Sequence, residues 1–135
     1  MRRQKHKKGD FEIWGFRVLN RWMTLRDRGE SLTMYFEDND LYNIAIYGLG
    51  ALGIHLYEEL REGKVSIEYG IDQNASGIKV DGLDIKTLED RLPRVDAVVV
   101  TPIAFYEIEK KIQKKMGKEV AILFIEDVVD YCFGK

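Results

Sequence analysis

Three glycines, Gly48, Gly50 and Gly53, form a G-x-G-x-x-G pattern, the spacing in this chain that points most directly to a chemistry. They follow a short apolar run and open a segment with helical leucine spacing, so they stand at a predicted strand-to-helix turn. In such a turn the first glycine permits the tight bend, the second lets the backbone approach a pyrophosphate, and the third allows close helix–strand packing. The amides then face an anion at the positive end of the helix. The predicted phosphate-binding residues are Gly48, Leu49, Gly50, Ala51, Leu52 and Gly53.

Asp72 supplies the acid that this pattern requires at the end of the next strand. It closes a second apolar run and lies 22 residues after Gly50, where the fingerprint places an acid about 20 residues on. A carboxylate there would accept hydrogen bonds from a ribose diol and repel a 2′-phosphate, which favours NAD-type over NADP-type ligands. We therefore add Asp72 and its neighbour Gln73 to the predicted cofactor site. In the alternative interpretation, the glycine turn only packs tightly and Asp72 caps a loop.

Thr101 and Pro102 follow the most continuous β-branched run of the chain, which predicts a central parallel strand. Ligands of open α/β sheets bind at the carboxyl ends of the strands, so this pair is expected to face bound phosphates or ribose. The pair is equally consistent with an N-cap followed by a first-turn proline, and the two roles are compatible.

Glu126 and Asp127 follow the last predicted strand, at the same edge of the sheet. They are weaker candidates, because helix N-termini also attract acids.

Tyr106 and Lys110 have the Y-x-x-x-K spacing of short-chain dehydrogenases and sugar epimerases, in which the tyrosine is the acid/base and the lysine lowers its pKa. On a helix the two side chains would share a face. The pair comes only 58 residues after Gly48, whereas those enzymes carry it much later, in a larger substrate-holding domain. We interpret the spacing as chance and assign no catalytic residue, with Tyr106 and Lys110 as the weak candidates.

The elements that must position these residues alternate along the chain. Apolar runs that predict strands occupy residues 42–48, 65–72, 95–101 and 120–125. Asp81 and Gly82 predict a small hairpin or a turn into a third strand, and a short helix is expected at 87–92, ended by Pro93. We therefore predict an α/β fold: a Rossmann-like, five-stranded, mainly parallel sheet in the order 3-2-1-4-5, with helices on both faces.

A helical hairpin is predicted ahead of this sheet. Residues 11–28 carry an amphipathic stripe, Gly29 fits a helix stop, and Ser31 fits the cap of a second short helix. The predicted division is a basic flexible terminus (1–10), the helical hairpin (11–40) and a Rossmann-type nucleotide-binding domain (41–135). The stripe could pack on the helices of the sheet or pair with a second copy, giving a homodimer; its residues are Phe11, Trp14, Val18 and Trp22.

Composition narrows the class of protein. The 135 residues are 45% hydrophobic and 33% charged, which is ordinary for a globular chain. A single cysteine, Cys132, excludes an internal disulfide and favours the cytoplasm, and with only His6 and His55 beside it no metal site is predicted. No apolar run is long enough for a membrane span.

Charge is unevenly distributed along the chain. Residues 1–9 hold five basic residues and no acid, so the rest of the chain, whose total net charge is −2, carries a net charge of −7. This acidic body would repel a polyanion, so no nucleic-acid partner is predicted.

Several segments resemble one known family. The stretches NIAIYGLGALGIHLYEEL, YGID, VDAVVVTP and VAILFIEDV look like the small Rossmann-type NAD(P)- or nucleotide-sugar-binding domains of bacterial surface-polysaccharide biosynthesis proteins. That family includes nucleoside-diphosphate-sugar epimerase-like domains and the N-terminal domains of sugar O-acetyltransferases. The resemblance covers about residues 42–133. It implies the fold and a ligand that is NAD, a nucleotide sugar or coenzyme A. The acetyltransferase β-helix is missing, so acetyl transfer is not implied.

From these patterns we expect a nucleotide-binding module for an NAD-type dinucleotide or a nucleotide sugar, without a complete catalytic site of its own. The resemblance implies an accessory or sensory role beside a polysaccharide-biosynthesis enzyme. The first alternative is an NAD-dependent oxidoreductase or epimerase acting on nucleotide sugars, with Tyr106 and Lys110 as its acid/base pair. The second is an oligomerising scaffold whose nucleotide site is vestigial.

Overall fold

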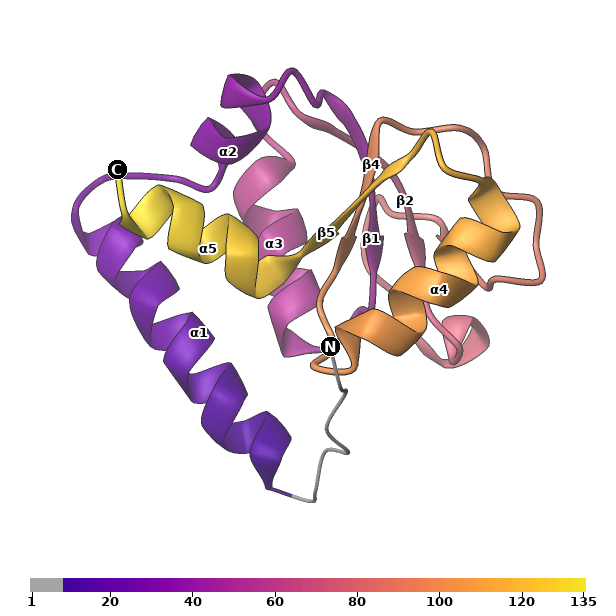
Figure 1. The fold of residues 1–135 in the computed structure, drawn as a ribbon, viewed down its shortest axis with the longest axis horizontal. Helices are drawn as coiled ribbons and strands as arrows, with labels where there is room; N and C mark the ends of the chain where they lie inside the picture. Colours follow the sequence, from indigo (N-terminus) through magenta and orange to yellow (C-terminus); the bar gives the residue numbers. More distant parts are fainter. Residues whose placement is uncertain (1–8) are drawn as a thin grey trace.

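A five-stranded, all-parallel sheet forms the centre of the protein in a computed structural model that describes residues 9–135 (Figure 1). The order is β3-β2-β1-β4-β5, so the predicted α/β fold and strand order are confirmed. The strands are β1 (Asn43–Tyr47), β2 (Ser66–Ile71), β3 (Ile85–Lys86), β4 (Ala97–Val100) and β5 (Ala121–Phe124). The helices are α1 (Asp10–Asp27), α2 (Thr33–Asp38), α3 (Ala51–Leu60), α4 (Phe105–Met116) and α5 (Ile125–Phe133), with a 3₁₀ turn η1 (Ala75–Gly77). The predicted basic terminus, residues 1–10, lies outside the described residues except for its last two.

Each face of the sheet has its own core, because side chains of a strand alternate between the two faces. Ile44 and Ile46 of β1 point into a core that also contains buried residues of α1, α2, α3 and α5. Ala45 and Tyr47 point to the other face, where α4 covers the sheet through Ile108. Figure 1 shows this division, with α4 alone on one side and the other helices opposite. The central strand β4 is buried along its whole length, as its run of β-branched residues predicts.

The two predicted N-terminal helices form, and both pack against α5. Val18, Trp22 and Leu25 of α1 are buried in the core of the sheet. Val18 and Trp22 of the amphipathic stripe thus pack within their own chain, whereas Phe11 is 50% exposed. Pairing of the stripe with a second copy stays a prediction. No helix among residues 9–135 is long and apolar enough to cross a bilayer.

Two local predictions are wrong. Residues 87–92 form no helix, although the capping contact exists: the Thr87 amide donates to Asp90 Oδ2 at 2.8 Å. Pro93 disfavours helical backbone in the residue before it, and the contact between Thr87 and Asp90 closes a turn instead, in which the Asp90 amide donates to the Thr87 carbonyl oxygen at 3.2 Å. Thr101 is not the N-cap of α4, because α4 begins at Phe105. The predicted turn at Asp81 and Gly82 does form, with Gly82 at φ 79°.

Candidate functional site

The turn from β1 into α3 lies at the carboxyl edge of the sheet and is tightly packed around its two outer glycines. Gly48 has φ 92°, in the left-handed region that favours glycine. A Cβ there would lie 2.6 Å from Thr101 Oγ1 and 2.8 Å from Pro102 Cδ. A Cβ on Gly53 would lie 1.9 Å from the carbonyl oxygen of Gly48. Packing therefore requires both glycines, whatever the turn binds.

Gly50, the middle glycine, is different. Its φ of −79° and ψ of −160° are open to any residue, and a Cβ there would meet no heavy atom within 4 Å. It directly precedes Ala51, the first residue of α3, and no side chain caps this helix. The first-turn amides of a helix lack intrahelical acceptors and carry the positive end of its dipole. The backbone around Gly50 thus presents donors beside open space, which is the arrangement that an anionic group needs.

Asp72 lies beside this turn, as predicted, but part of its function is structural. Its Oδ2 accepts from the Leu49 amide at 2.8 Å, and its Oδ1 accepts from the Asn74 amide at 2.9 Å. The Leu49 amide, predicted to face the anion, is therefore bound to the protein, and the Leu49 side chain is buried. A carboxylate has about four lone-pair sites, so Asp72 keeps acceptor capacity for a ribose diol. Gln73 is exposed next to it.

Tyr47 ends β1 below the turn and is buried. Burial, and after it the charge of Asp72, raises the pKa of the Tyr47 phenol. Tyr47 therefore stays protonated at neutral pH and adds no charge beneath the turn.

Thr101 supports the turn from the neighbouring strand. The residue is 4% exposed, and its hydroxyl lies 2.9 Å from the carbonyl oxygen of Gly48 and 3.1 Å from that of Tyr47 and donates to this pair. Pro102 packs against Gly48 from the same side. The structure brings both residues to the predicted place, where they hold the shape of the glycine turn.

Tyr106 and Lys110 lie on the solvent face of α4. Ile108 and Ile112 turn towards the sheet, whereas Tyr106 is 51% exposed and Lys110 is also exposed. About half a helical turn separates Tyr106 and Lys110 from the two isoleucines. The side chains of Tyr106 and Lys110 therefore point away from the sheet. This placement gives no support to a catalytic role for the pair.

Of the two acids at the start of α5, Glu126 is bound by a side chain of α1. Arg21 of α1 pairs with Glu126 at 3.6 Å and with Asp130 at 3.0 Å. Partial burial, and then the charges of Glu126 and Asp130, raise the pKa of Asp127. Glu126 therefore joins α1 to α5. Within residues 9–135 no three His, Cys, Asp or Glu residues form a group that could hold a metal ion.

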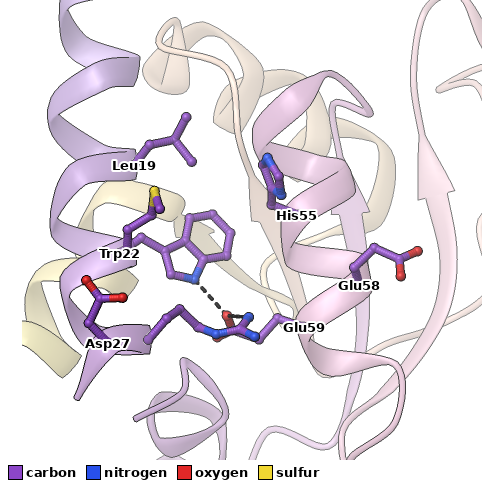
Figure 2. A pocket seen from close by; sticks show the side chains of 8 residues that line it. Leu19, Trp22, Asp27, His55, Glu58 and Glu59 are labelled. Carbon is purple, nitrogen blue, oxygen red and sulfur yellow. Dashed lines mark hydrogen bonds and ion pairs between the residues drawn. The ribbon is translucent and has the colours of Figure 1, made fainter. Parts of the chain in front are cut away.

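Glu59 is the main residue that the sequence pattern failed to identify, since Glu58 and Glu59 look like a solvated helix face. Its side chain is 3% exposed and accepts four hydrogen bonds, among them the one from Trp22 that Figure 2 shows. Oε1 accepts from Trp22 Nε1 at 2.9 Å and from Arg26 at 2.6 Å; Oε2 accepts from the Leu32 amide at 2.7 Å and from Ser31 Oγ at 3.2 Å.

This carboxylate borders a groove of about 460 Å³ between α1 and α3, in which His55 meets Trp22 edge-on. Because all four donors are the protein's own, Glu59 joins the N-terminal helices to α3. One signal was present in the sequence: residue 59 lies seven positions after Leu52 and three after Leu56, on the buried face of α3.

No protein-family model matches this chain, and no curated protein shows significant similarity to it. The resemblance to polysaccharide-biosynthesis domains therefore stays a prediction.

Proposed function

We propose that this protein is a nucleotide-binding module that seats an NAD-type dinucleotide or a nucleotide sugar on the turn from Gly48 to Gly53, with Asp72 at its ribose. The observation that carries this proposal is the contrast among the three glycines. Packing accounts for Gly48 and Gly53, whereas Gly50 faces open space beside uncapped helix amides. A close approach of a phosphate explains a glycine at that position.

An accessory or sensory role in polysaccharide or sugar-nucleotide metabolism follows from the sequence resemblance alone. An NAD-dependent oxidoreductase or epimerase would need Tyr106 and Lys110 to face the ligand, and their solvent-facing placement does not favour it. A scaffold with a vestigial nucleotide site predicts that blocking the turn leaves partner binding intact. The nucleotide-binding module is the function that the open backbone at Gly50 favours.

The test has two parts. Any small molecule carried through purification is released by denaturation and identified by mass spectrometry. Melting is then followed with NAD, NADP, UDP-sugars and coenzyme A. A ligand at 100 times its dissociation constant stabilises the native state by about 2.7 kcal/mol, which is readily seen as a shift in melting temperature.

Gly50→Val is the decisive variant, because a Cβ at this position meets no heavy atom within 4 Å and the side chain projects into the space proposed for the phosphate. It should melt close to the parent protein and lose the ligand-induced shift. Gly15→Ala in α1 is the control, since a Cβ there also meets nothing within 4 Å and Gly15 is not part of the predicted phosphate-binding turn. The control should keep the full shift. Absence of a shift with every ligand would contradict the proposal, as would an undiminished shift in Gly50→Val.

A further inference from the structure

We infer that the carboxyl edge of the sheet seats one nucleoside diphosphate unit over β1 and β2, and that its β4–β5 half is closed to a second nucleotide. This inference rests on the proposed function and narrows its ligand class. Nucleoside diphosphates and their sugar conjugates fit, whereas the second nucleotide of a dinucleotide has no seat on the protein.

The sheet itself contains one complete nucleotide-binding half. Folds that bind dinucleotides combine two such halves of three strands each, and the second nucleotide lies over the second half. Here β1, β2 and β3 complete the first half, while only β4 and β5 stand on the other side. At the end of β5, Phe124 is followed directly by Ile125, the first residue of α5. No loop is present at this junction to hold a ligand.

Three aromatic rings occupy the carboxyl end of β5. Phe124 stacks on Trp14 of α1, with ring centroids 5.4 Å apart and planes 4° apart. It also stacks on Phe105 of α4, at 4.9 Å and 24°. These are separations of rings in direct contact, so a nicotinamide or a second base could not enter between them without separating α1, β5 and α4. We name these three residues the aromatic stack.

Helix α1 is fixed over this half of the edge. Arg21 joins it to Asp130 and Glu126 of α5, and α1 and α5 pack against each other (Figure 1). The aromatic stack is therefore a joint between packed elements, with α1 held at both ends: by Trp14 near its start and by Trp22, through Glu59, nearer its end.

The β1–β2 half has the opposite character. Pro102 packs against Gly48 on the β4 side of the turn, while Gly50 faces open space. Asp72 stands at the end of β2, and Gln73 and the following residue are exposed. A ligand whose phosphate lies at Gly50 can thus place its ribose and base towards β2. On the other side of the turn, Pro102 packs against Gly48, and the aromatic stack covers the end of β5. The part of the ligand beyond its second phosphate therefore has no seat on this half of the edge and lies in solvent.

The test is isothermal titration calorimetry of the full chain with two series of ligands of increasing size. The first series is ADP, ADP-ribose and NAD, and the second is UDP, UDP-glucose and diuridine diphosphate. We expect the dissociation constants within each series to agree within about threefold, because the added groups make no contact. A gain of tenfold or more from ADP-ribose to NAD, or from UDP to diuridine diphosphate, would overturn the inference and leave the proposed function standing. Failure of all six ligands to bind would overturn both.

A spectroscopic measurement locates the ligand independently of affinity. The protein is labelled with 5-fluorotryptophan, and its two ¹⁹F resonances are assigned with Trp14→Phe. Trp14 reports on the aromatic stack. Trp22 is the matched control, eight residues further along α1 or about 12 Å away. The Trp14 resonance should respond equally to saturating ADP and NAD. A shift of Trp14 by NAD alone, with Trp22 unmoved, would overturn the inference.

Discussion

Two strand-to-helix junctions at the carboxyl edge of this sheet show how differently one edge can be built. From β1 to α3 the chain passes through Gly48, Leu49 and Gly50, and the backbone at Gly50 is open. From β5 to α5 it passes directly from Phe124 to Ile125, between aromatic rings from two other helices. The first junction exposes backbone donors, whereas the second covers its strand end with side chains. Parallel topology places strand ends at one edge, but residue size at each junction decides whether that end is open to a ligand.

The largest effect is expected from breaking the packing of the open junction. Gly53→Ala would bring a Cβ to 1.9 Å from the carbonyl oxygen of Gly48. Because that neighbour is backbone, α3 has to move away from β1. We expect a loss of about 3 kcal/mol and a melting temperature lower by roughly 10 °C, followed by circular dichroism. Gly50→Ala is the control and should melt near the parent protein. Equal melting of the two variants would show that the outer and middle glycines do not differ as described.

A smaller effect is expected from loosening the helix that covers the closed junction. Glu59→Ala removes the acceptor of four donors and leaves the Trp22 indole and the Leu32 amide without their partner. The free energy of unfolding should fall by about 2 kcal/mol in urea denaturation. Glu58→Ala changes a neighbour whose side chain is 58% exposed, and should stay within about 0.5 kcal/mol of the parent. If both variants cost the same, Glu59 does not join α1 to α3.

The smallest effect concerns the Cys132 thiol on the buried face of α5. Burial raises the pKa of Cys132 from 9.0 to about 11, and the side chain is 1% exposed. At pH 8 iodoacetamide should therefore label the native protein at least 100-fold more slowly than the urea-unfolded protein, because the reactive thiolate is both scarce and covered. Equal labelling rates would mean that α5 opens readily and that the closed half of the edge is not closed.

The same thiol predicts a dependence of stability on pH. Its pKa is higher in the folded state than in the unfolded state, so the folded protein holds this proton more tightly between about pH 9 and 11. Its contribution is fully present below pH 9 and is lost as the pH rises through that range. Urea midpoints of the parent protein and of Cys132→Ala, compared at pH 8 and pH 10, should converge as the pH rises.

Local patterns were sufficient for the fold and for the glycine turn. The apolar runs and helical stripes predicted the strands, because these periodicities follow from the geometry of each element alone. Their order followed from the alternation of strands and helices, since βαβ crossovers are right-handed. Asp72 was located by its distance in the sequence from the glycines, since both ends of that βαβ unit have fixed positions. The helix expected at residues 87–92 does not form, because a capping pair followed by a proline is also compatible with a turn, and Thr87 and Asp90 close such a turn here.

The sequence by itself determined which residues form the sheet and where its one glycine-rich turn lies. Only the tertiary structure decided what that turn contacts. Thr101 reaches the Gly48 carbonyl across 53 residues, and Glu59 meets Trp22 across 37. The aromatic stack joins three elements that no local pattern connects. Periodicity tells which side of an element is buried, whereas the partner that meets it depends on how whole elements pack. That packing left Gly50 open and closed the end of β5.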